Sequence, residues 1–296
     1  MILDKIINAT YDKYFEESNT DFCDHMKNYF IFDDSLICEL FKHIKSSIKY
    51  ADNGLWDENP ITAGIIKVLL ESLQSKFPVN VFKNTGKIEN KFGDIAFVVT
   101  FHLPEGKTFN GVSFIEAKKD YPQQDYKFSA FESKQMNRFL ENTRSSFYVF
   151  YSHKSFLPII ETAFLKQIIE GAEIKDGQLK IEHINLRRLL STFPTQIDRY
   201  LRGYDLDFSK IALDISKGNS NKAGSPKYIF HIEVGFDGGA PEPTPGQTPP
   251  FNPNPDIYRK LDVKDFDEFL KNEKEEKEEQ HNSEIKPRRN RGPGFF

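Results

Sequence analysis

The sequence predicts an α/β fold whose core runs helix, three-stranded meander, helix and strand, with a helical N-terminal cap and a C-terminal extension. Apolar residues recur at helical spacing up to about residue 78, whereas residues 79–117 contain β-branched and aromatic runs separated by turns. Helical spacing returns between residues 129 and 143. With 296 residues, 38% of them hydrophobic and including 28 Phe, the chain can bury a substantial aromatic core.

Helices are expected first along the chain. Residues 1–50 carry apolar side chains at helical spacing, which predicts a cap of two or three helices. In the stronger helix that follows, Asp57 or Asn59 can cap the N-terminus and Pro60 suits the first turn. The helix should end near residues 76–78, and its apolar face comprises Ile61, Ile65, Val68, Leu69 and Leu73.

Three strands are expected next, at residues 79–82, 95–103 and 112–117, because β-branched and aromatic residues dominate each run. Pro-Glu-Gly and Asn-Gly turn sequences separate the last two runs, which predicts a meander. A helix at residues 129–143 and a buried strand at residues 147–151 complete the core.

The rest of the chain divides by composition. Helical spacing at residues 156–169 and 186–200, and an apolar run at 228–234, predict an α/β extension of the core. A Pro/Gly-rich stretch cannot sustain a helix or a ladder. Beyond it, residues 257–271 could form one short helix, and an acidic run with a basic end follows. The expected parts are an N-terminal helical cap (1–50), the core (51–160), the extension (161–236), a linker (237–256) and a charged flexible tail (257–296).

Composition excludes several classes of protein. Two cysteines, Cys23 and Cys38, exclude a disulfide framework, and no apolar run approaches the roughly 18 residues that span a bilayer. We therefore expect a cytoplasmic protein without a membrane partner. The net charge of −4 does not indicate a nucleic-acid binder. Basic residues are nevertheless frequent between Lys118 and Arg144, so a basic groove on an acidic body is compatible with the sequence.

Three residues stand out as candidates for chemistry: Asp94, Glu116 and Lys118. Asp94 opens one apolar run, and Glu116 and Lys118 end the next. Residues two apart in a strand face the same side, so Glu116 and Lys118 project together and the backbone carbonyl of Ala117 lies beside them. If the hairpin places Asp94 beside Glu116, two carboxylates converge on one cation, as metal-assisted phosphodiester hydrolysis requires.

The string Gly93-Asp94, followed after a gap by Glu116-Ala117-Lys118, resembles the PD-(D/E)XK nuclease superfamily, with Gly93 where proline is often found. The resemblance covers residues 56–151 and implies a restriction endonuclease-like core. It implies that Asp94 and Glu116 bind Mg²⁺, or alternatively Mn²⁺, and that Lys118 orients the attacking water.

Relatives in that superfamily often add a carboxylate from the helix before the meander, and two candidates exist here. Glu58 matches a Glu-Asn-x-x-Thr helix start and is favoured, while Glu71 lies further along the same helix. The helix after the motif often adds a polar residue, for which Gln135 is the best match, with Lys134 or Arg138 as phosphate contacts.

An alternative interpretation assigns no chemistry to these residues. Asp94 would then cap a turn, and Glu116 and Lys118 would form an exposed pair on a strand. Other Glu-x-Lys triplets occur, such as the one at Glu89, but only the triplet at Glu116 ends an apolar β run. The seven His residues lack metal-ligand spacing, and no phosphate-binding glycine loop or Gly-x-Ser-x-Gly elbow occurs.

Together these features predict a Mg²⁺-dependent DNA endonuclease, and the resemblance implies a bacterial defence or restriction role. No DNA-reading module is recognisable in the sequence, so targeting is expected from a partner protein or from self-association into a homo-oligomer. Two alternatives stay open: a catalytically silent subunit that binds or assembles with other proteins, and cleavage of RNA.

Overall fold

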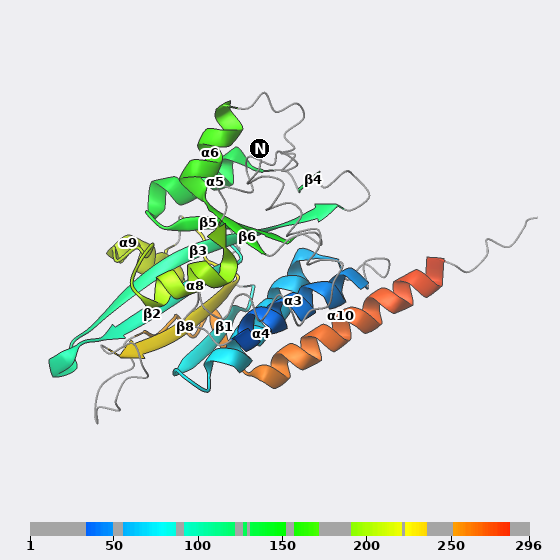
Figure 1. Cartoon of the computed structure of the whole chain (residues 1–296), viewed down its shortest axis with the longest axis horizontal. Helices are drawn as coiled ribbons and strands as arrows, with labels where there is room; N and C mark the ends of the chain where they lie inside the picture. The colour runs from blue at the N-terminus through cyan, green and yellow to red at the C-terminus, as the bar shows by residue number, and fades with distance from the viewer. Residues whose placement is uncertain are drawn as a thin grey trace, which may run out of the picture.

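The computed structural model describes residues 34–49, 56–86, 92–121, 127–128, 131–151, 157–171, 191–220, 223–235 and 251–284. Eight of its strands form one mixed sheet in the order β7-β6-β5-β3-β2-β8-β1-β9, and β4 pairs with β3 beside this path (Figure 1). The strands are β1 (Val79–Asn84), β2 (Ile95–His102), β3 (Thr108–Tyr121), β4 (Lys127–Phe128), β5 (Ser146–Tyr151), β6 (Pro158–Glu161), β7 (Ser191–Thr192), β8 (Tyr228–Gly235) and β9 (Tyr258–Leu261).

The centre of the sheet is its most apolar part. Strand β2 runs antiparallel to β3 and parallel to β8, and β3 runs parallel to β5. Strands β2, β5 and β8 read as nearly continuous apolar runs, and every residue of β3 from 111 to 118 is buried, which suits strands covered on both faces. The expected α/β class is therefore confirmed.

Helices cover both faces of this sheet (Figure 1). One face packs against α3 (Asp34–Lys49), α4 (Glu58–Leu73), α8 (Phe193–Leu201) and α10 (Val263–Glu284). The other face packs against α5 (Ser133–Asn142), α6 (Thr162–Gly171) and α9 (Lys210–Ser216). Alternate residues of β2 pack on opposite faces of the sheet. Ile95, Phe97 and Val99 face the first set of helices, and Ala96 and Val98 face the second.

Helix α4 begins as its sequence predicts. Asp57 is the N-cap residue, and its carboxylate accepts a hydrogen bond from the Glu58 N–H at 2.7 Å. Pro60 lies in the first turn, where no backbone donor is needed. This cap fixes the start of α4 beside β3, where the Glu58 side chain meets the backbone of Lys119.

The predicted three-stranded meander is wrong. β2 and β3 form the expected hairpin, but β1 pairs with β8 and β9 and is separated from β2 by β8. The reason lies in β8, whose first five residues are all buried: a strand this apolar is stable only between two neighbours. β8 belongs to the segment expected as an extension, so residues 51–160 and 161–236 share one sheet.

The tail expected over residues 257–296 is also corrected. Residues 258–261 form β9 on the edge of the sheet, and residues 263–284 form α10. Phe266 of α10 is buried, and the Asp267 carboxylate lies 2.8 Å from the Lys67 Nζ of α4. Scattered aromatic residues in a charged helix are enough to dock it, so the segment is part of the fold. Residues 285–296 lie outside the described part of the chain.

Other expectations differ in their bounds. The expected helix at 156–169 is the short strand β6 followed by α6, and the helix expected at 186–200 is α8, from Phe193 to Leu201. Residues 1–33 of the cap and most of the linker lie outside the described residues. Among the helices that the structure describes, none is both long enough and apolar enough to cross a membrane.

Candidate active site

Gly93 makes the turn that leads into β2. Its φ is +86°, a conformation that an L side chain rarely adopts and that a proline ring forbids. A Cβ atom on Gly93 would lie 3.1 Å from the backbone oxygen of Ile115 and 3.3 Å from the Phe139 ring. Glycine at the position where proline is often found is therefore a requirement of this turn.

Asp94 is held against two strands by three hydrogen bonds. Its N–H donates to the Ile115 carbonyl at 2.9 Å, and its own carbonyl accepts from the Tyr228 N–H at 2.8 Å. Its carboxylate Oδ2 accepts from the Ala117 N–H at 2.9 Å. The backbone and the carboxylate of Asp94 are thus fixed beside the part of β3 that carries Glu116.

Glu116 and Lys118 lie two residues apart on β3, where hairpin pairing with β2 has ended. The Lys118 Nζ lies 2.8 Å from the Glu116 Oε1. Only 7% of Glu116 and 9% of Lys118 is exposed. The alternative of an exposed strand pair is therefore wrong about exposure, although the two side chains do form an ion pair.

The charges of these groups act on one another. Burial, followed by the nearby charge of Glu116, raises the pKa of Asp94 to about 7, against the effects of the Ala117 hydrogen bond and of Lys227. Burial alone would lower the pKa of Lys118, but Glu116, through its charge and its hydrogen bond, outweighs burial and raises it. Lys118 is therefore an ammonium at neutral pH, whereas burial and the charge of Glu116 favour the protonated form of Asp94.

Of the two candidate carboxylates on α4, Glu58 lies next to this cluster. Its Oε1 accepts a hydrogen bond from the Lys119 N–H at 3.1 Å, and its charge adds to the raised pKa of Asp94. Glu71 lies 13 positions further along α4, about 20 Å along the helix axis. There it faces Lys67, with 3.5 Å between Nζ and Oε1.

Gln135 is not brought into the cluster. It is half-buried near the start of α5, and its backbone N–H donates to the Glu132 carbonyl. Within the described residues, its side chain has no hydrogen bond to Asp94, Glu116 or Lys118. Its expected role in the site therefore stays a prediction.

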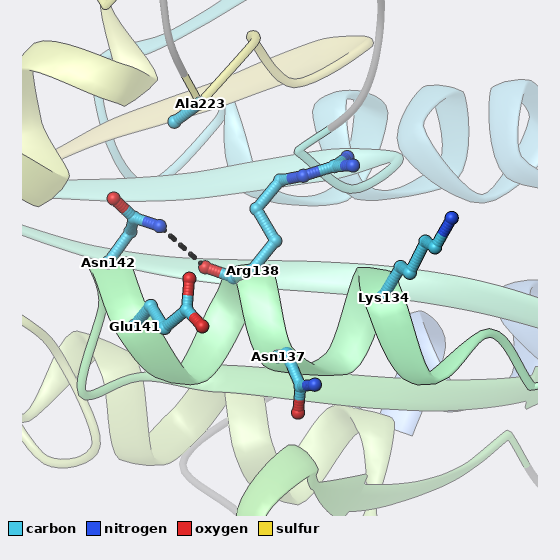
Figure 2. A pocket seen from close by; sticks show the side chains of 6 residues that line it. All are labelled: Lys134, Asn137, Arg138, Glu141, Asn142 and Ala223. Atoms are coloured by element: carbon cyan, nitrogen blue, oxygen red, sulfur yellow. Dashed lines mark hydrogen bonds between the residues drawn. The ribbon is translucent and has the colours of Figure 1, made fainter.

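The same helix borders an open groove of about 510 Å³ (Figure 2). Figure 2 shows Lys134 and Arg138 extending from the same side of α5, with Ala223 across the groove from Arg138. The spacing of four residues puts both cations on one helix face. The lining residues are Lys134, Asn137, Arg138, Glu141, Asn142 and Ala223.

Two residues near the cluster were missed by the sequence interpretation. Lys227 directly precedes β8, its N–H donates to the Gly93 carbonyl at 3.1 Å, and its Nζ contacts the Asn59 side chain. Tyr148 of β5 pairs in register with Glu116. Neither belongs to a local motif, because both come from strands whose neighbours are set by the sheet as a whole.

The donor set is suited to a hard divalent cation, since Asp94, Glu116 and Glu58 all offer carboxylate oxygens. In the described part of the chain, however, no group of three or more His, Cys, Asp or Glu side chains already has the geometry to hold a metal ion. The Glu116 carboxylate instead faces Lys118. A cation at this site would therefore share the Glu116 carboxylate with Lys118 or displace the lysine from it.

No family model, curated protein or solved structure matches this chain.

Proposed function

We propose that the chain is a Mg²⁺-dependent DNA endonuclease with a restriction endonuclease-like active site centred on Asp94, Glu116 and Lys118. The observation that carries this proposal is the geometry of the half-buried Asp94, whose carboxylate is held by the Ala117 N–H on the strand that carries Glu116, close enough for the Glu116 charge to raise the pKa of Asp94. Two acidic groups so placed are unfavourable unless a cation compensates them. A divalent cation bound there would compensate the two carboxylates and so stabilise the folded protein.

The residues that would hold the cation are Asp94 and Glu116, with the Ala117 carbonyl and Glu58 completing an all-oxygen set. Oxygen ligands favour Mg²⁺ or Mn²⁺ over Zn²⁺. Bound there, the cation would supply Lewis-acid stabilisation of the phosphate and a more acidic water. The hydrogen bond from Ala117 keeps the Asp94 carboxylate oriented in the absence of any ligand.

The role of Lys118 follows from its charge. Its raised pKa keeps it protonated at neutral pH, so it donates hydrogen bonds and does not accept a proton. The Lys118 ammonium, which lies beside Glu116, would orient a water molecule towards the phosphate. Lys118 is therefore assigned to positioning the nucleophile, and a general base must be found elsewhere.

DNA is the proposed substrate, with Lys134 and Arg138 in contact with its phosphates. Such contacts act through charge and weaken as salt is added. A defence or restriction role, with targeting by a partner protein or by a second copy of the chain, belongs to the same proposal. It rests on the resemblance of the Gly93-Asp94 and Glu116-Ala117-Lys118 strings alone.

A second candidate is a catalytically silent subunit that binds or assembles with other proteins. The closed Glu116–Lys118 ion pair favours it, because a buried acid that is already neutralised by a lysine can be purely structural. RNA cleavage by the same residues is a further outcome of the test below.

The test is a cleavage assay with supercoiled plasmid, single-stranded DNA and RNA, each with Mg²⁺ or with EDTA. Asp94→Asn and Lys118→Met should abolish Mg²⁺-dependent cleavage, while Lys260→Met, at an exposed lysine of β9, should not. Glu58→Gln should reduce cleavage and Glu71→Gln should leave it unchanged. Cleavage that persists in Asp94→Asn and Lys118→Met would remove the assignment, and cleavage of RNA alone would change the substrate.

A further inference from the structure

The hydroxyl group of Tyr148 is buried without a hydrogen-bond partner. Tyr148 has no exposed surface, and within the described residues Tyr148 and Thr162 are the two side chains with a buried, unpartnered oxygen. Buried polar groups in folded proteins are nearly always hydrogen-bonded, to protein or to ordered water. An exception therefore requires an explanation.

Other buried tyrosines of this protein follow the rule. The Tyr151 hydroxyl lies 2.8 Å from the Thr62 hydroxyl, and Tyr200 accepts from the Ser113 hydroxyl at 2.9 Å. The Tyr258 hydroxyl donates to the Pro226 carbonyl at 2.9 Å. Tyr148 and Tyr151 both lie near the acidic cluster, but of these four tyrosines only Tyr148 has a hydroxyl without a partner among the described residues.

Tyr148 lies directly beside Glu116. The two residues are paired in the parallel register of β3 and β5, so their side chains leave the same face of the sheet. The Phe131 and Phe139 rings pack around the Tyr148 ring, with centroids 5.7 and 6.3 Å away. These contacts fix the ring, and a fixed ring fixes the position of its hydroxyl oxygen.

The hydroxyl is a permanent donor. Burial, and then the charges of Glu116, Glu132 and Asp94, raise the pKa of Tyr148 far above its usual value. At neutral pH the oxygen keeps its proton and can donate one hydrogen bond. A hydrogen-bond acceptor placed between the Tyr148 hydroxyl and the carboxylates of Asp94 and Glu116 would satisfy this donor.

We propose that the Tyr148 hydroxyl donates its hydrogen bond to a water molecule held beside Asp94 and Glu116, and so acts as a positioning residue of this site. The inference rests on the proposed function, since this water would be part of the surroundings of the bound cation. A buried water needs two to four polar partners. The Tyr148 hydroxyl would be one, and the carboxylate of Glu116, its neighbour in the register of β3 and β5, would be another. Hydrogen bonds of this kind typically change metal affinity or activity 10- to 100-fold.

The test compares Tyr148→Phe with Thr162→Val, which removes the other unpartnered hydroxyl. Each variant is melted in EDTA, titrated with Mg²⁺ by calorimetry and assayed for plasmid cleavage. Tyr148→Phe should melt at or above the wild-type temperature, because it removes an unpaired polar group. It should bind Mg²⁺ at least about 10-fold more weakly and lose kcat with little change in KM. Thr162→Val should leave Mg²⁺ binding and cleavage unchanged.

Wild-type Mg²⁺ affinity in Tyr148→Phe would overturn the inference. So would a fall in its metal-free melting temperature of about 3 °C or more, which would reveal a hydrogen bond within the protein. If the wild type binds Mg²⁺ but cleaves no nucleic acid, the proposed function fails, and the ratio of the two Mg²⁺ affinities still decides the role of Tyr148. If the wild type binds no Mg²⁺, both proposals fail.

Discussion

The Asp94 carboxylate accepts a hydrogen bond from the Ala117 N–H at 2.9 Å, which ties the residue that opens β2 to the strand that carries Glu116 and Lys118. This bond replaces the ladder pairing that ends at Ile95 and Ile115. The acid is thus oriented by backbone atoms, whose positions do not depend on a bound ligand. The effect of substituting Asp94 by Asn can therefore be interpreted as the effect of removing its charge.

The raised pKa of Asp94 predicts a pH-dependent stability in the absence of metal. Folding favours the protonated acid, so the stability it contributes is full below about pH 4 and is lost as the pH rises through about 7. Asp94→Asn cannot ionise and keeps an acceptor for the Ala117 N–H. In EDTA at pH 8 the variant should be more stable than the wild type by about 1–3 kcal/mol in urea unfolding, and the difference should vanish near pH 4.

Asp207→Asn is the matched control for this pH effect. Burial opposes ionisation of Asp207, but hydrogen bonds from the Arg144 and Ser209 N–H groups outweigh burial and lower its pKa. Its substitution should therefore reduce stability at pH 8. A stability gain in Asp207→Asn, or none in Asp94→Asn, would contradict this electrostatic account.

The buried Glu116–Lys118 pair predicts a strong coupling between the two residues. Lys118→Met leaves the Glu116 charge buried without its partner, which typically costs about 3–5 kcal/mol. The double variant Glu116→Gln with Lys118→Met removes both charges and should recover most of that loss. A double-mutant cycle in denaturant measures the coupling, and additive effects would show that the pair contributes nothing.

The conformation of Gly93 predicts that a side chain at this position reduces the stability of the fold. Gly93→Ala places a Cβ in a left-handed conformation and 3.1 Å from the Ile115 carbonyl oxygen. Gly86 has a similar φ, +85°, but open space around its Cβ position. Gly86→Ala should thus cost about 1 kcal/mol from conformation alone, and Gly93→Ala should cost clearly more. Equal losses of stability in the two variants would show that the close contact between the added Cβ and the Ile115 carbonyl oxygen is unimportant.

The docking of α10 predicts that a residue near the C-terminus stabilises the whole fold. Phe266 is 1% exposed, and its ring lies 6.4 Å from that of Tyr228, centroid to centroid. Phe266→Ala should cost about 3–5 kcal/mol, whereas Phe164→Ala, at a residue 40% exposed, should cost much less. Thermal unfolding measures both. No loss in Phe266→Ala would restore the flexible tail expected from the sequence.

The sequence predicts local features of this protein better than distant ones. The start of α4 and the β2–β3 hairpin depend on residues close in the chain: the sequence predicts the hairpin and offers Asp57 as one of two candidates for the cap. The hairpin also placed Asp94 near Glu116. The insertion of β8 between β1 and β2 depends on pairing across more than 130 residues, for which no local pattern exists. Lys227, which directly precedes β8, was missed for the same reason. Tyr148 was missed because its register with Glu116 depends on the parallel pairing of β3 and β5.

The most direct test of the account is a calorimetric titration of the metal-free protein with Mg²⁺ at pH 8. We predict a saturable Mg²⁺ site in the wild type. The site should be lost in Asp94→Asn and in Glu116→Gln and retained in Glu71→Gln. Its affinity should fall as the pH is lowered through about 7, because Asp94 then takes up a proton. Binding that is unchanged in Asp94→Asn, or no binding in the wild type, would contradict the account.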